Sequence, residues 1–357
     1  MNKCTLLIDG NWLLMSRFFA IGKGFNIDNE TWEKEKSQEE LEELLVRSIN
    51  VILNRFYGTI DNIILVADGG SWRKQLPKPY AMEESYKGNR GQAEELDWEY
   101  IYGALNNVYK RFDELGITCC KDLHIEGDDW CWYWSRRLNS DGINCIIWSS
   151  DNDLKQLVQV DNFAFTAWYN DRNGLFFHES LKEKQIDEID FFMTQETENE
   201  LIKQLKQQVI QNVSYVDPYN IIASKIVCGD AGDNIKSLIR VKKGTRTYKV
   251  SEKEWETCRS QLNLNTLDEF LENKETIVAT LLGNTKYKGQ PVDNEAILEM
   301  FDYNTKLVWL NEQVIPETII HSMNEYEYKE YDLSYIRNNF KVLLKRDNII
   351  ENIFEGI

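Results

Sequence analysis

Three short apolar runs in the first part of the chain each lead into an aspartate: Cys4–Ile8 precedes Asp9, Ile63–Ala67 precedes Asp68, and Asn144–Trp148 precedes Asp151. Runs of this length between turn residues are typical of strands buried on both faces, which belong to parallel sheets covered by helices. The segments 37–57 and 94–115 have helical spacing of apolar residues. We therefore predict a mostly parallel central sheet flanked by helices, an α/β fold, with the aspartates at the carboxyl ends of its strands.

A further group of acids follows a short predicted strand near 117–120. Glu126, Asp128 and Asp129 occupy three of four successive positions, at the start of a helix predicted over 130–138. Because the carboxyl ends of parallel strands meet at one edge of a sheet, we expect these acids to lie beside the three aspartates. With Asp153 and the i,i+3 pair from the second half, the predicted metal ligands are Asp9, Asp68, Glu126, Asp128, Asp129, Asp151, Asp153, Asp230 and Asp233.

So many neighbouring carboxylates repel one another unless cations neutralise them. Mg²⁺ takes only one or two carboxylates directly and keeps several waters, so this set predicts two Mg²⁺ or Mn²⁺ ions. Such a pair, about 3.5–4 Å apart, can activate water on one side of a phosphodiester and stabilise the leaving oxygen on the other. Gly127 is expected to let the backbone turn so that Glu126 and Asp129 face one ion. Taken singly, each aspartate also fits an ordinary turn or helix cap.

Composition narrows the class of protein. With 41 basic and 59 acidic residues, the formal net charge is −18, so nucleic acid binding needs local basic patches or metal ions. Seven cysteines without a CxxC spacing and three scattered histidines argue for reduced thiols, a cytoplasmic location and no zinc site. Nothing in the sequence has the length or composition of a signal peptide or a membrane span, so no membrane partner is expected.

Two segments concentrate cations. Residues 71–90 mix them with aromatic rings and read as an exposed excursion, and residues 236–249 contain six cations and no acid. Both are predicted to contact phosphates, since each neutralised phosphate releases counterions; a solvated basic face or loop is the alternative for each. The predicted nucleic-acid-binding residues are Arg73, Lys74, Tyr86, Lys236, Arg240, Lys242, Lys243, Arg246 and Lys249.

The chain is predicted to have two parts. Residues 1–188 form the α/β core with the excursion at about 71–100, and residues 189–357 are mostly helical. Ser37 and Glu40 have the spacing of a capping box, which predicts a helix start at Ser37. Pro218 predicts the start of a helix ending near Gly229. The apolar C-terminal segment 349–354 fits either a buried terminal helix or a docking tail for a replication partner.

Several motifs together resemble the flap endonuclease and 5′-nuclease family. In the family's order, the chain has Leu7-Ile8-Asp9, the segment 86–90, Glu126-Gly127-Asp128-Asp129, the segment 149–157 and the segment 229–235. Within the family it is most similar to the T-even bacteriophage subgroup, whose members are ribonucleases H that act as 5′-to-3′ exonucleases on RNA primers and flaps.

The resemblance implies roles by position. Asp9, Asp68, Glu126, Asp128 and Asp129 would surround one metal ion, and Asp151, Asp153, Asp230 and Asp233 would surround the second. Lys87 and Arg90 would be the catalytic basic pair that grips the scissile phosphate from a helical arch, and their i,i+3 spacing on a helix would present both to one phosphate. The chain departs from the family after Asp233, where a single glycine replaces a glycine-rich hairpin, which puts a bound potassium ion in doubt.

These observations predict a Mg²⁺-dependent 5′-to-3′ exonuclease or flap endonuclease acting during replication. Its substrates would be duplex DNA or RNA–DNA hybrid with a 5′ end or flap, and the protein would be a monomer that meets partners such as a single-strand-binding protein or sliding clamp. The alternatives are a catalytically silent nucleic-acid-binding protein on the same scaffold and a small-molecule phosphohydrolase. Loss of activity in EDTA separates the enzyme from the silent binder.

Overall fold

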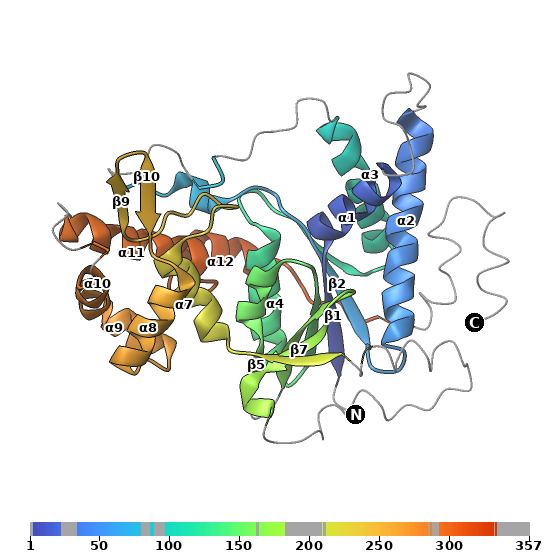
Figure 1. The fold of residues 1–357 in the computed structure, drawn as a ribbon. Coiled ribbons are helices and arrows are strands. Elements are labelled where there is room, and N and C mark those ends of the chain that lie inside the picture. The colour runs from blue at the N-terminus through green and yellow to red at the C-terminus, as the bar shows by residue number, and fades with distance from the viewer. Residues whose placement is uncertain are drawn as a thin grey trace. The chain divides into compact units, whose positions relative to one another are not determined.

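The computed structural model describes residues 3–22, 34–79, 86–88, 97–161, 164–182, 209, 212–284, 286–287, 293–331 and 333. The chain forms two compact units (Figure 1). The first comprises Met1–Gly70, Glu95–Val216 and His321–Ile357, and the second comprises Ser71–Glu94 and Asp217–Ile320. This division differs from the predicted split at residue 188, because the excursion after Gly70 groups with the second unit and the C-terminal segment returns to the first.

The first unit is built on a sheet whose central strands are parallel. Along the sheet the order is β3 (Thr118–Cys120), β2 (Asn62–Val66), β1 (Cys4–Asp9), β4 (Asn144–Trp148), β6 (Phe165–Asn170), β7 (Gly174–His178) and β8 (Val213–Val216), with β5 (Gln159–Val160) paired to β6. The five strands from β3 to β6 run parallel, whereas β6 pairs antiparallel with β7. The predicted mostly parallel sheet is confirmed.

Helices cover both faces of this sheet (Figure 1). On one side lie α1 (Gly10–Gly22), α2 (Lys34–Arg55) and α3 (Trp98–Glu114), and on the other lies α4 (Gly127–Ser140). Alternate strand residues such as Leu6, Ile63 and Ile146 share a buried cluster with the first three helices, as the period of a strand requires. Helix α2 begins at Lys34, so Ser37 lies inside the helix and the predicted helix start at Ser37 is wrong.

Two short 3₁₀ helices complete the described part of this unit. The first, η2 (Asn152–Leu157), follows β4. The second, η3 (Glu179–Leu181), follows β7.

Within the described residues, no helix is long and apolar enough to cross a membrane.

A tyrosine-rich strap from the C-terminal part of the chain, residues 326–331, binds the edge of the sheet. The hydroxyl of Tyr331 accepts a hydrogen bond from the Ile63 amide at 2.6 Å and donates to the Ile63 carbonyl at 2.8 Å. Paired residues of β3 begin only opposite Ile64, so the tyrosine satisfies backbone groups of β2 that have no strand partner on that side. The ring of Tyr326 packs against Trp130 of α4, with the centroids 4.7 Å apart.

The second unit is mostly helical. Its elements are η1 (Trp72–Gln75), α7 (Pro218–Cys228), β9 (Arg240–Lys243), β10 (Arg246–Lys249), α8 (Glu252–Leu262), α9 (Leu267–Glu272), α10 (Lys274–Leu282) and α11 (Asn294–Val308), and α12 (Glu317–Asn324) leads back to the first unit. Its core includes Trp255, Phe270 and Phe301: the rings of Trp255 and Phe270 meet edge to face with centroids 5.3 Å apart, and those of Phe270 and Phe301 lie 5.0 Å apart. The helix predicted from Pro218 is confirmed as α7. The predictions for 189–208 and 349–354 lie outside the described residues.

Candidate active site

The order of the strands brings three predicted ligands to one edge of the sheet. Strand β1 lies between β2 and β4; the connection after β1 leads to β2 on one side, whereas the connection after β4 leads toward β6 on the other side. Such a switch point opens a crevice at the carboxyl ends of the strands, where ligands of parallel sheets bind. Asp9 is the last residue of β1, and Asp68 and Asp151 follow β2 and β4 closely.

Asp9 is a buried carboxylate with only 8% of its surface exposed. It accepts hydrogen bonds from the Trp12 amide at 3.0 Å and from the Ser149 hydroxyl at 2.7 Å. Burial raises the pKa of Asp9 to about 7, against the lowering effect of these two bonds, and the charges of Asp68 and Asp151 add to the rise. The three carboxylates therefore lie close enough to repel one another, which favours a cation among them.

Ser149 connects two of these acids, and the sequence analysis did not single it out. Its hydroxyl donates to Asp9 and accepts from the Asp151 amide at 3.0 Å, and its side chain is fully buried. The carboxylate of Asp151 in turn accepts from the Asp153 amide at 2.9 Å. A serine directly after a buried strand and two residues before an aspartate has the pattern of a side-chain turn, and that signal could have found it.

Asn11 is a second site residue that the sequence did not single out, and it holds Asp68 through both the side chain and the backbone of that aspartate. The amide nitrogen of Asn11 donates to the Asp68 carboxylate at 2.8 Å, and the Asp68 backbone amide donates to the Asn11 oxygen at 3.1 Å. The Gly127 amide also donates to this carboxylate, at 2.6 Å. Asp68 thus binds a backbone N–H group at the start of helix α4, where the helix dipole favours negative charge.

Glu126 and Asp129 cap the same helix. Each carboxylate accepts from the backbone amide of the other residue, so the two form a capping box, and Asp129 is fully buried. A Cβ atom at Gly127 would lie 3.2 Å from an oxygen of Asp68 and 3.9 Å from one of Asp9. A side chain here would crowd the Asp68 carboxylate, which gives the glycine a role different from the backbone turn that was expected. Asp128 lies in the first turn of the helix.

The donor chemistry fits a hard divalent cation. Carboxylate oxygens are the ligands that Mg²⁺ and Mn²⁺ prefer, and the raised pKa of Asp9 records the unfavourable charge that a cation would relieve. Across the described ranges, however, no three His, Cys, Asp or Glu side chains are arranged to hold one metal ion together.

Asp230 and Asp233 belong to the second unit. Asp230 forms an ion pair with Lys225 at 2.5 Å and accepts from the Gly232 amide at 2.7 Å. Burial opposes ionisation of Asp230, but the ion pair and these hydrogen bonds outweigh it and lower its pKa. The Lys87 amide donates to the Asp233 carbonyl at 2.9 Å, which joins the segment 86–88 to the Asp233 loop. That the two aspartates complete a metal site with Asp151 stays a prediction.

The cations of the excursion differ in their surroundings. Residues 86–88 form a turn with Lys87 at a φ of 54°, so the helical presentation expected for Lys87 is wrong, and Arg90 lies outside the described residues. The Lys87 ammonium stacks on the ring of Tyr86 at 4.8 Å. Arg73 is buried and donates to the Leu307 carbonyl at 3.1 Å, so it packs within the second unit, whereas Lys74 is exposed.

The cations of 236–249 gather on a hairpin. Strands β9 and β10 form a two-stranded antiparallel sheet whose turn contains Gly244 at a φ of 62°. Lys236 contacts the Asn234 side chain and precedes the hairpin. The other five predicted nucleic-acid contacts of this segment are all exposed: Arg240, Lys242, Lys243, Arg246 and Lys249.

Comparison with known proteins places this architecture in one family. A family model described as 5′-3′ exonuclease, N-terminal resolvase-like domain, matches residues 4–188, which is just over half of the chain. The chain therefore belongs to the 5′-3′ exonuclease family.

Individual relatives agree with this assignment. A 5′-3′ exonuclease of Buchnera aphidicola subsp. Schizaphis graminum is 24% identical over 184 residues, which cover 51% of this chain and 57% of that protein. The crystal structure of a T5 protein co-crystallized with metal ions matches 96% of this chain and 100% of its own, with a TM-score of 0.52 and 15% identity. A bacteriophage T5 flap endonuclease in complex with DNA and metal ions matches the same shares, with a TM-score of 0.51 and 14% identity. These two structures share the fold.

Proposed function

We propose that this protein is a divalent-metal-dependent 5′-nuclease that hydrolyses phosphodiester bonds at 5′ ends and flap junctions of duplex DNA or RNA–DNA hybrids. The observation that carries the proposal is the buried carboxylate of Asp9, held by Ser149 beside Asp68 and Asp151 at the switch point of the sheet. The family assignment supports it, and the similar T5 structures hold metal ions and, in one case, DNA.

In this proposal the residues of the chain bind the metal ions and orient them and the substrate. Asp9, Asp68 and Asp151, with the other predicted acids, hold Mg²⁺ or Mn²⁺, and bound divalent ions supply water activation and charge for the leaving oxygen. Ser149 and Asn11 fix the carboxylates before the substrate arrives, which removes part of the cost of ordering them. Lys87 and Arg90 attract the scissile phosphate, and the hairpin holds the duplex backbone.

Three more specific features of the function are proposed from the resemblance in sequence. They are the use of two ions, the removal of RNA primers as in the T-even subgroup, and a role in replication beside a single-strand-binding protein or a sliding clamp. A catalytically silent binding protein would gain nothing from mutually repelling carboxylates at a phosphate site, which favours the enzyme.

Nuclease assays on a 5′-flap duplex with Mg²⁺ test the proposal. Asp151→Asn should lower the rate at least 100-fold, on the order of the loss when a preorganised charge is removed from a reacting centre. Asp113→Asn is the matched control, because Asp113 is exposed and pairs with Lys329 away from the site. EDTA should abolish cleavage and leave some duplex binding. Cleavage that survives both EDTA and Asp151→Asn would rule out the metal-dependent mechanism.

A further inference from the structure

The hairpin β9–β10 places cations directly opposite one another. Lys243 pairs with Arg246 across the strands, and Arg240 pairs with Lys249. All four side chains are exposed. Like charges directly opposite destabilise an antiparallel pair, and a two-stranded hairpin alone is at best marginally stable in water. The hairpin therefore needs stabilisation from the rest of the second unit.

Part of that stabilisation comes from burial at the base of the hairpin. Val241 and Val250 belong to the core of the second unit and expose only 6% and 1% of their surfaces. The hydroxyl of Ser237 accepts from the Val250 amide at 3.1 Å and lies 3.3 Å from the Ile239 carbonyl, to which it donates. These contacts fix where the hairpin begins and ends, but they do not reach the ends of the strands nearer its tip.

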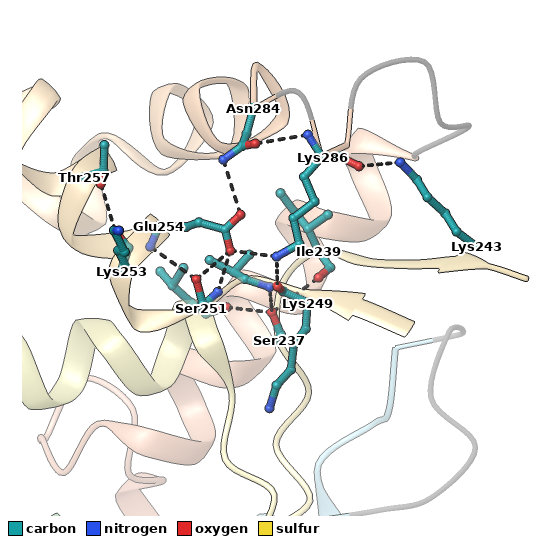
Figure 2. A network of polar contacts seen from close by, with 12 residues as sticks. Ser237, Ile239, Lys243, Lys249, Ser251, Lys253, Glu254, Thr257, Asn284 and Lys286 are labelled. Atoms are coloured by element: carbon teal, nitrogen blue, oxygen red, sulfur yellow. Dashed lines mark hydrogen bonds and ion pairs between the residues drawn. The ribbon is translucent and has the colours of Figure 1, made fainter. Parts of the chain in front are cut away.

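Lys286, in the segment after α10, ties both strands (Figure 2). Its ammonium group donates to the carbonyl of Lys249, the last residue of β10, at 2.6 Å and to a carboxylate oxygen of Glu254 at 2.8 Å. The carbonyl of Lys286 accepts from the ammonium group of Lys243, the last residue of β9, at 2.8 Å. One residue thus contacts the last residue of each strand.

Glu254 on helix α8 holds this lysine in place. The same carboxylate oxygen that binds Lys286 accepts from the amide and the hydroxyl of Ser251 at 2.9 and 2.7 Å. The other oxygen accepts from the Asn284 side chain at 3.3 Å, and Asn284 accepts from the Lys286 amide at 3.1 Å. The Lys286 and Glu254 side chains are only 26% and 16% exposed, so water and salt screen the pair less than an open surface pair.

We propose that Lys286 and Glu254 are positioning residues that hold the cationic hairpin in the conformation that binds the phosphate backbone of duplex nucleic acid. The inference rests on the proposed function for the identity of the ligand. Holding like charges together in the free protein is unfavourable, but it prepares an anion site, so less order has to be gained on binding. Phosphates placed between the paired cations would then relieve the repulsion.

The test compares charge-matched variants for duplex binding in EDTA over a series of salt concentrations. Glu254→Met and Lys286→Met should each weaken binding about 5- to 10-fold at every salt concentration, with an unchanged slope, since the direct phosphate contacts remain. Arg246→Ala should instead reduce the slope of log affinity against log salt by about 1. Lys286→Arg, which keeps the charge and the donors, should retain most of the affinity.

Two controls separate positioning from net charge. Glu252→Met removes a charge from an exposed residue in the first turn of the same helix, and Lys274→Met removes one from a surface pair with Asp302. Loss of an acid should by itself favour DNA binding, so Glu252→Met should bind the duplex as tightly as the wild type or more tightly, whereas Glu254→Met should bind it more weakly. Equal behaviour of the two variants would overturn the proposal, as would a slope for Lys286→Met reduced like that of Arg246→Ala.

Hydrogen exchange in the free protein tests the same inference without nucleic acid. The amides of residues 240–249 should exchange at least 5-fold faster in Lys286→Met and Glu254→Met, and at the wild-type rate in Lys274→Met. Unchanged exchange in the first two variants overturns the positioning role even if the protein is a nuclease. If the wild-type protein neither cleaves nor binds a flap duplex, both proposals fail. Faster exchange in the two variants would then not support the positioning role.

Discussion

The hydroxyl of Ser149 donates a hydrogen bond of 2.7 Å to the buried carboxylate of Asp9 and joins the ends of strands β1 and β4. Ser149→Ala should therefore lower the nuclease rate about 10- to 100-fold, the range found when a partner that orients a metal ligand is removed. Steady-state cleavage over a series of Mg²⁺ concentrations measures it. Ser135→Ala is the control, because that serine is also fully buried but bonds the Trp132 carbonyl within α4. Equal losses in the two variants would contradict the assignment.

The raised pKa of Asp9 predicts how the metal-free protein responds to pH. An acid whose pKa rises from 3.8 to about 7 on folding favours the folded state fully below pH 4, and this stability is lost as the pH rises from 4 to 7. At pH 8, Asp9→Asn should raise the unfolding free energy in EDTA by up to about 4 kcal/mol, and at pH 4 by little. Denaturant unfolding at the two pH values measures it. A gain of equal size at both would refute the charge explanation.

Divalent ions should offset the same cost of ionising the buried carboxylate of Asp9. Mg²⁺ added at pH 8 should raise the melting temperature of the wild type, because binding to the folded state alone stabilises it. The rise should be much smaller for Asp9→Asn, which has lost a ligand. A scan of melting temperature against Mg²⁺ concentration provides the measurement, and identical curves for both proteins would place the ion elsewhere.

Gly127→Ala should affect the site more than the fold. The added Cβ would meet Asp68 at 3.2 Å and Asp9 at 3.9 Å, while alanine is itself favourable in a helix. The unfolding free energy should change by less than about 1 kcal/mol, and the Mg²⁺ needed for half-maximal cleavage should rise several-fold. Unaltered Mg²⁺ dependence would mean that these two carboxylates do not bind an ion near Gly127.

Tyr331→Phe should destabilise the first unit. It removes the hydroxyl that bonds the Ile63 carbonyl and amide; the amide still donates to the Asn62 side chain, but the carbonyl loses its donor, and an unsatisfied buried backbone group costs about 1–3 kcal/mol. Thermal or denaturant unfolding measures the loss. Tyr102→Phe, at a partly buried tyrosine against the same core, should change the unfolding free energy by less than about 0.5 kcal/mol. A loss confined to the control would show that the strap does not stabilise the sheet.

The sequence determined the strands, their parallel arrangement and the positions of Asp9, Asp68 and Asp151 at one edge, because apolar runs and turn residues are local signals. It also located α7 and the helix that begins with the acid cluster. It failed at Ser37, since a capping pattern can occur inside a longer helix, and at Lys87, since nothing local to that lysine indicates its left-handed turn.

Only the tertiary structure decided which side chains serve the acids. Ser149 meets Asp9 across 140 positions of the chain, and Asn11 meets Asp68 across 57, contacts that depend on which strands become neighbours. The same holds for Lys286 and Glu254 beneath the hairpin and for Tyr331 on Ile63. Hydrophobic pattern and helix or strand propensity depend on a few neighbouring residues, whereas the partner of a buried polar group is set by tertiary packing. The sequence therefore identifies the charged residues of the site, and the tertiary structure determines which side chains orient them.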